Sequence, residues 1–75
     1  AGGGEGKLAQ YLLCAGGETG EITLSATQLC QRIGVGRATL YRAFEALEKA
    51  GAIRRRGKTI GITDRDKLRA YSNPS

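Results

Sequence analysis

The sequence predicts a mainly α-helical domain that carries one small β-hairpin. Four segments have apolar residues at helical spacing, a three-residue glycine turn joins the second and third of them, and an alternating segment centred on a glycine follows the third. Two helices joined by a short glycine turn form a helix-turn-helix, and a hairpin directly after the second helix makes it winged. The predicted architecture is therefore a winged helix-turn-helix.

The N-terminal part is predicted to contain a linker, a helix and a short strand. Residues 1–6 include four glycines and are expected to be a flexible linker or an expression remnant. The domain itself is predicted over residues 7–71, with a frayed tail at 72–75. Within it, residues 7–15 form a helix that Gly16-Gly17 ends, and residues 21–24 alternate like a strand.

The second helix begins at a capping box and ends at a glycine turn. Ser25 is its expected N-cap and Gln28 stands three residues later, as a capping box requires. The helix ends near Gly34, which opens the turn Gly34-Val35-Gly36. Its inner apolar stripe is predicted to be Leu29, Cys30 and Ile33.

The third helix is predicted over residues 37–50, with Gly51 as its C-terminal glycine. One stripe is apolar and points to the core: Leu40, Ala43, Phe44 and Leu47. The opposite side carries Ala38, Tyr41, Arg42, Glu45 and Lys49.

The hairpin follows this helix. Ile53 is expected to pair with Ile60 and Ile62 around the turn Arg56-Gly57-Lys58. Asp64 then caps a last short helix that carries Leu68 and Tyr71.

Composition excludes several classes of protein. Seventy-five residues make one domain, and 40% hydrophobic with 25% charged residues is a globular composition. There is no histidine, no acidic pair is placed for acid–base work, and no apolar run is long enough to span a membrane. Cys14 and Cys30 are too few for a zinc cluster and are expected to be small buried hydrophobes. We therefore expect no enzyme, no catalytic residues, no metal site and no membrane partner.

Positive charge is concentrated in the second half of the chain. The net charge is +5. Residues 1–31 hold one basic and three acidic residues, a balance of −2, and residues 32–75 hold eleven basic and four acidic residues, a balance of +7. A basic half on a small domain is typical of a polyanion binder such as a nucleic-acid-binding protein.

Arginines at the start of the third helix are the candidates for reading bases. Arg37 stands where the helix dipole disfavours a cation, which favours a functional role, and arginine commonly binds guanine O6 and N7. Arg42 either contacts a base or phosphate or pairs with Glu45 or Glu48. Tyr41 either contacts DNA, through a thymine methyl or a phosphate, or lies on the surface.

Small and basic residues around this helix are the candidates for phosphate contacts. Gly36 and Thr39 let its first turn approach phosphates closely. Ser25 and Thr27, at the start of the preceding helix, can bond the DNA backbone too, although Ser25 equally serves as a cap. The hairpin cations are more numerous than charge protection of an edge strand requires, which favours phosphate contacts over protection; they are Arg54, Arg55, Arg56 and Lys58.

The stretch from Leu24 to Arg42 resembles the DNA-binding domain of the cyclic-AMP receptor protein/fumarate–nitrate regulator (CRP/FNR) superfamily. The family pattern places a leucine and a serine or threonine before the second helix, a glycine in the turn, and two arginines in the third helix. The similarity continues through Gly51-Ala52-Ile53 and Gly57-Lys58-Thr59-Ile60-Gly61-Ile62 to Asp64 and Leu68. Together these motifs extend over about fifty residues of the chain.

The resemblance implies roles for individual residues. Arg37 and Arg42 correspond to the family's base-contacting arginines, and Ser25, Thr27, Thr39 and Lys58 fall where family members contact phosphates. Two positions depart from the pattern. Ala38 replaces a glutamate that can accept from cytosine, so Ala38 is expected to face a different base, for example a thymine methyl. Gly36 replaces a serine, which removes a hydroxyl and a good N-cap.

The resemblance also implies partners and a setting. It implies palindromic double-stranded DNA as the target of a bacterial transcription regulator, a homodimer in the full-length protein, and RNA polymerase as a further partner. A sensor domain is expected upstream, so no cofactor is expected in these residues. The expected location is the cytoplasm, at the nucleoid. The alternative hypothesis is a winged-helix module that binds another protein through the same helix.

Overall fold

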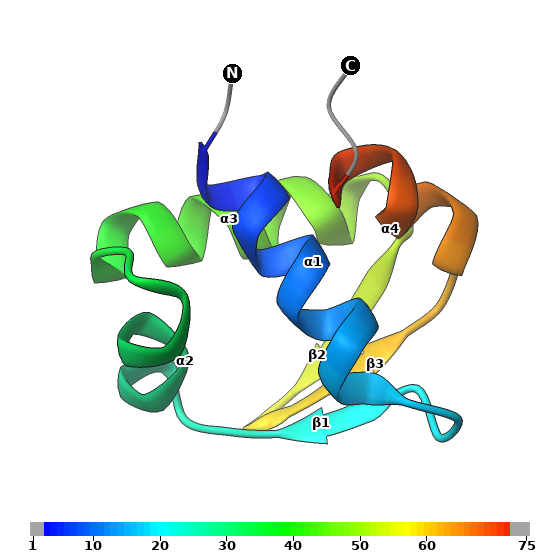
Figure 1. The fold of residues 1–75 in the computed structure, drawn as a ribbon, viewed down its shortest axis with the longest axis horizontal. Helices are drawn as coiled ribbons and strands as arrows, with labels where there is room; N and C mark the ends of the chain where they lie inside the picture. The colour runs from blue at the N-terminus through cyan, green and yellow to red at the C-terminus, as the bar shows by residue number, and fades with distance from the viewer. Residues whose placement is uncertain (1–2, 73–75) are drawn as a thin grey trace.

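A computed structural model describes residues 3–72 of the chain, and it forms four helices and three short strands (Figure 1). In chain order the elements are α1 (Gly3–Gly16), β1 (Glu21–Thr23), α2 (Ala26–Ile33), α3 (Arg37–Lys49), β2 (Ile53–Arg56), β3 (Thr59–Ile62) and α4 (Arg65–Ser72). The predicted winged helix-turn-helix is thereby confirmed. β1 pairs with β3 on the side opposite β2, so the hairpin is part of a small three-stranded sheet.

The connection between α2 and α3 is the tight turn that the sequence predicts. Ser25 accepts a hydrogen bond from the Gln28 amide, and the Gln28 side chain accepts one from the Ser25 amide, so the capping box is confirmed. Gly34 ends α2 with φ of 72°, a left-handed conformation that glycine adopts without strain. Its amide donates to the Cys30 carbonyl over 2.9 Å. This turn sets the angle between α2 and α3.

The sheet is antiparallel with strand order β1-β3-β2. Ile53 pairs with Ile62, as predicted, but Ile60 opposes Arg55 and not Ile53, because the turn at residues 57–58 places Arg56 opposite Thr59 and so sets the register. Gly57 has φ of 60°, which suits such a two-residue turn. β1 is one residue shorter than predicted, although the Leu24 amide, next in the same register, still donates to the Lys58 carbonyl just before β3 begins. That bond ties the wing turn to the start of α2.

The core is built around α3. Its predicted apolar stripe, Leu40, Ala43, Phe44 and Leu47, is buried. α1 packs against α3 and α4; in Figure 1 it runs across α3 with α4 beside it, and the sheet lies below these helices. The other buried apolar residues are Leu8, Ala9, Leu12, Ile22, Leu29, Ala52, Ile53, Ile60 and Leu68. Asp64 caps α4, because its carboxylate accepts from the Lys67 amide over 3.1 Å.

The first helix, α1, begins earlier than the sequence predicts. It begins at Gly3, so residues 3–6, predicted as a flexible linker, are helical, and Ser72, predicted to begin the tail, is the last residue of α4. Residues 1–2 and 73–75 lie outside the described residues. The cause is tertiary: Gly4 is buried, and a Cβ placed on it would lie 2.6 Å from Thr39 Cγ2.

The two cysteines are less buried than predicted. Cys14 is exposed and Cys30 is half-buried, so neither is a buried hydrophobe. Cys14 lies two residues after the buried Leu12, on the other side of the helix.

The close approach of α1 to α3 at Gly4 leads to a prediction about stability. Gly4→Ala is expected to lower the free energy of unfolding by about 1 kcal/mol, the middle of a range of about 0–2 kcal/mol. Overpacking against Thr39 costs about 1–3 kcal/mol, which exceeds the gain of at most about 1 kcal/mol from alanine in a helix. Urea unfolding followed by circular dichroism measures the change.

The matched control is Gly36→Ser. A Cβ on Gly36 meets nothing within 4 Å and its φ is −79°, so this variant should change stability by only a few tenths of a kcal/mol. A Gly4→Ala protein as stable as the parent contradicts the account of α1.

Candidate nucleic-acid interface

One side of α3 is free of the core and carries the predicted base-reading residues. Arg37, Ala38, Tyr41 and Arg42 are all exposed, and Tyr41 is 47% exposed, the one large hydrophobic side chain among the described residues left this open. They occupy the first two turns of the helix, nearest the glycine turn. The structure therefore places these four predicted residues on one accessible surface.

The first turn of α3 is open to solvent at its N-terminus. Gly36 occupies the N-cap position with extended backbone and no side-chain hydrogen bond caps the helix there. Free amides at such a position attract anions. Thr39 is less available than the sequence suggests, since it is half-buried and its methyl faces Gly4 of α1.

Arg37 is held by a residue of α2. Its Nη2 donates to Thr27 Oγ1 over 2.6 Å, across the turn that joins the two helices. The sequence predicts a base contact for Arg37 and a DNA-backbone contact for Thr27, and no sequence signal indicates that the two side chains contact each other. The structure brings them together as an exposed pair.

Ser25 is occupied by its capping role. Its hydroxyl accepts from the Gln28 amide over 3.1 Å and lies 3.3 Å from Gln28 Oε1, which can only accept its proton. The hydroxyl of Thr27, by contrast, accepts from Arg37 and donates to no group within residues 3–72. Of the two hydroxyls at the start of α2, Thr27 is thus the one with a free proton.

A groove of about 170 Å³ joins three parts of the predicted site. Ser25 at the start of α2, Tyr41 of α3 and Lys58 of the wing turn line it together. The backbone bond from Leu24 to Lys58 holds the wing turn at this place. The start of α2, the exposed side of α3 and the wing turn therefore form one continuous surface, which we call the α3–wing surface.

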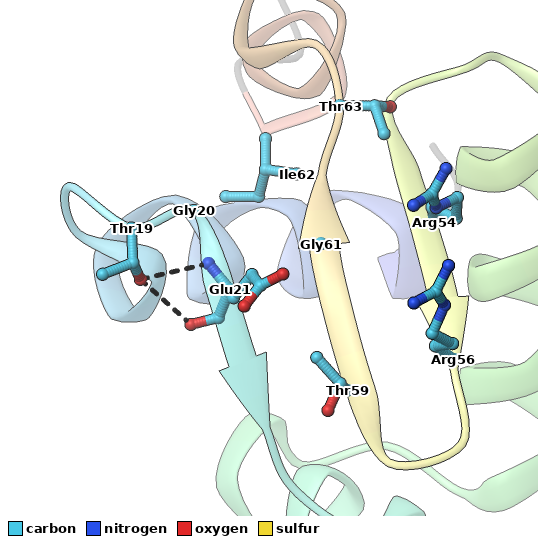
Figure 2. A pocket seen from close by; sticks show the side chains of 9 residues that line it. All are labelled: Thr19, Gly20, Glu21, Arg54, Arg56, Thr59, Gly61, Ile62 and Thr63. Atoms are coloured by element: carbon cyan, nitrogen blue, oxygen red, sulfur yellow. Dashed lines mark hydrogen bonds between the residues drawn. The ribbon is translucent and has the colours of Figure 1, made fainter.

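The wing arginines divide between the two faces of the sheet. Arg54 and Arg56 are exposed on the outer face and extend beside Gly61 and Thr59 of β3, as Figure 2 shows. Glu21 of β1 lies across the same face. These residues line a shallow groove of about 290 Å³. Arg56 and Lys58, the two predicted backbone contacts of the wing, are both accessible.

Arg55 points to the inner face and contacts α3. Its guanidinium carbon lies 4.3 Å from the centre of the Phe44 ring and 5.7 Å from that of Tyr41. Its Nε donates to Glu48 Oε1 over 3.2 Å. Arg55 therefore connects the wing to α3 through cation–π and ionic contacts. Strand alternation counted from the buried Ile53 would have found this, because residues 53 and 55 share a face.

Arg42 forms an ion pair with neither Glu45 nor Glu48, the two acidic residues predicted as its alternative partners. Among the ion pairs within residues 3–72, Glu48 pairs with Arg55, and none joins Arg42 to Glu45 or Glu48. Arg42 is exposed on the α3–wing surface. Its side chain is thus available to a ligand.

The described residues contain neither a candidate metal cluster nor a candidate membrane span. Within residues 3–72, no three His, Cys, Asp or Glu side chains come together in a way that could hold a metal ion. In the same part of the chain, every helix is too short or too polar to cross a membrane.

A family model describes most of the chain. The model of the Crp-like helix-turn-helix domain matches residues 6–71. The chain belongs to the Crp-like helix-turn-helix domain family. This is the family that the sequence resemblance indicated, and it is a family of DNA-binding helix-turn-helix domains. No curated protein matches the sequence.

Solved structures of two Crp-like regulators have the same fold. The catabolite activator protein of Thermus thermophilus superposes with a TM-score of 0.82 at 20% identity, over 95% of this chain and 34% of that one. The CO-dependent transcription factor CooA of Carboxydothermus hydrogenoformans, in its imidazole-bound form, gives 0.80 at 23% identity, over 92% and 36%. The chain thus spans about a third of the length of these proteins.

The contacts of Arg55 lead to a prediction about stability. Arg55→Ala is expected to lower the free energy of unfolding by about 1–2 kcal/mol, because it removes a cation–π contact, a partly exposed ion pair and the packing of the arginine stem. Arg54→Ala is the matched control, one residue earlier on the opposite face of the same strand. It should change stability by no more than about 0.5 kcal/mol. Equal losses in urea unfolding contradict the assignment of Arg55.

Proposed function

We propose that this domain binds double-stranded DNA in a sequence-specific manner through the α3–wing surface. The observation that carries the proposal is the exposed side of α3, whose first two turns present Arg37 and Arg42 beside the start of α2 and the wing turn. A helix about 10–12 Å wide fits the major groove, which is about 12 Å wide. The buried stripe of α3 holds the helix on the domain from behind.

Base reading is proposed for the exposed residues of α3. Arg37 and Arg42 bind base edges, and Ala38 and Tyr41 make apolar contacts there. Ala38 has no acceptor for the hydrogen bond that a glutamate would accept from cytosine. It packs against a thymine methyl instead and so selects thymine. The two arginines are the residues through which a guanine is recognised.

Phosphate contacts are proposed for the residues at the edges of this surface. Thr27 has a free hydroxyl proton, Gly36 leaves the amides at the start of α3 uncapped, and Arg56 and Lys58 are exposed on the wing. Ser25 and Thr39 contribute less, because the hydroxyl of Ser25 bonds Gln28 and Thr39 packs on α1.

The partners of the whole regulator are part of the same proposal. Two copies of the domain in a homodimer bind the half-sites of a palindrome about 34 Å apart. The regulator acts on a bacterial chromosome, in the cytoplasm, and RNA polymerase is a further partner. DNA binding as proposed needs no cofactor held by this domain.

Selection from a randomised duplex library, with the domain artificially dimerised and at two salt concentrations, tests the proposal. We expect an enriched palindrome and binding that falls steeply with salt. Absence of enrichment together with binding that is insensitive to salt contradicts the proposal and favours a protein-interaction module.

A substitution at Arg37 tests its role. Arg37→Ala is expected to weaken binding to the selected site by about 1–3 kcal/mol and binding to random DNA only slightly, because a bidentate base contact is lost. The control is Arg32→Ala, an exposed arginine in the last turn of α2. Fluorescence anisotropy with both duplexes measures the effect. Equal losses on both duplexes refute base reading by Arg37.

Salt dependence tests the phosphate contact at the wing. Lys58→Gln should make the slope of log K against log salt shallower by about 0.9, the value for one released counterion. Lys67→Gln is the matched control, since Lys67 is an exposed lysine on α4, away from the α3–wing surface. It should leave the slope unchanged. A slope that is the same in Lys58→Gln and the parent excludes this contact.

A further inference from the structure

We propose that Thr27 is a positioning residue that orients Arg37 for base reading and thereby contributes to DNA specificity. The inference rests on the proposed function and assigns Thr27 a role beyond a phosphate contact. The observation is the 2.6 Å bond from Arg37 Nη2 to Thr27 Oγ1, which joins the first turns of α2 and α3.

The chemistry of the two groups permits this bond to persist on DNA. A guanidinium has five N–H donors, and Thr27 uses one of them, so a pair remains for guanine O6 and N7. The threonine hydroxyl accepts from Arg37 and keeps its own proton for a phosphate oxygen. Thr27 can thus connect the DNA backbone, which sets the register of the protein, to the side chain that reads the base.

The benefit of the bond comes from preorganisation. A free arginine side chain samples many rotamers, and ordering it on binding weakens affinity. Both residues are exposed, and Thr27 is the only partner of the Arg37 side chain within residues 3–72. Without the bond, Arg37 must be ordered when DNA binds. This loss of affinity affects the specific complex, because only in that complex does a base hold Arg37.

Thr27→Val tests the inference, because it keeps the shape of the side chain and removes the hydroxyl. We expect the ratio of affinities for the selected site and for the same site changed at the base pair read by Arg37 to fall by about two- to tenfold. Thr27→Ser keeps the hydroxyl and should restore the ratio. In an Arg37→Ala background, Thr27→Val should not change the ratio further.

Three results overturn the inference while the proposed function stands: equal losses on all duplexes in Thr27→Val, no recovery in Thr27→Ser, or the same loss in the Arg37→Ala background. A parent chain without any base preference overturns the proposed function and the inference with it. Nitrogen NMR of the Arg37 guanidinium, recorded without DNA, tests the bond separately. Its rotation should be slower in the parent and Thr27→Ser than in Thr27→Val, and equal rotation in all three excludes the bond.

Discussion

Burial of one stripe of α3 is the constraint on which the rest of the structure depends. Leu40, Phe44 and Leu47 are held by α1 behind and by the sheet beyond, so the helix can present only its other side to solvent. That side carries Arg37 and Arg42. The same apolar contacts that make a domain of 75 residues stable therefore also determine which side chains can reach a ligand.

Strand alternation divides the positive charge of the wing between two tasks. Arg54 and Arg56 point outward, while Arg55 points inward to the rings of α3 and to Glu48. Arg55 of the wing thus connects the wing to α3. The bond from Leu24 to Lys58 connects the wing turn to the start of α2 in the same way. The three parts of the α3–wing surface are consequently fixed relative to one another by contacts that involve neither Arg37 nor Arg42.

Local patterns predicted most of this fold, and long-range contacts account for the differences. Helical spacing identified the buried stripe of α3, and Ser25 with Gln28 identified the start of α2. The glycine-rich start reads as a linker because glycine disfavours a helix locally, yet packing on Thr39 requires a residue without a side chain at Gly4. The site residues on α3 were foreseeable from their spacing. The bond between Arg37 and Thr27 was not, because it depends on the angle between two helices.

The most direct test of the central claim is an amide NMR titration of the isotope-labelled domain with the selected DNA duplex. The account predicts that the largest shift changes occur in the first two turns of α3, at the start of α2 and in the wing turn at residues 57–58. The amides of α4 should change little. Changes concentrated on α1 and α4, with the first two turns of α3 unaffected, contradict the claim that the exposed side of α3 reads DNA.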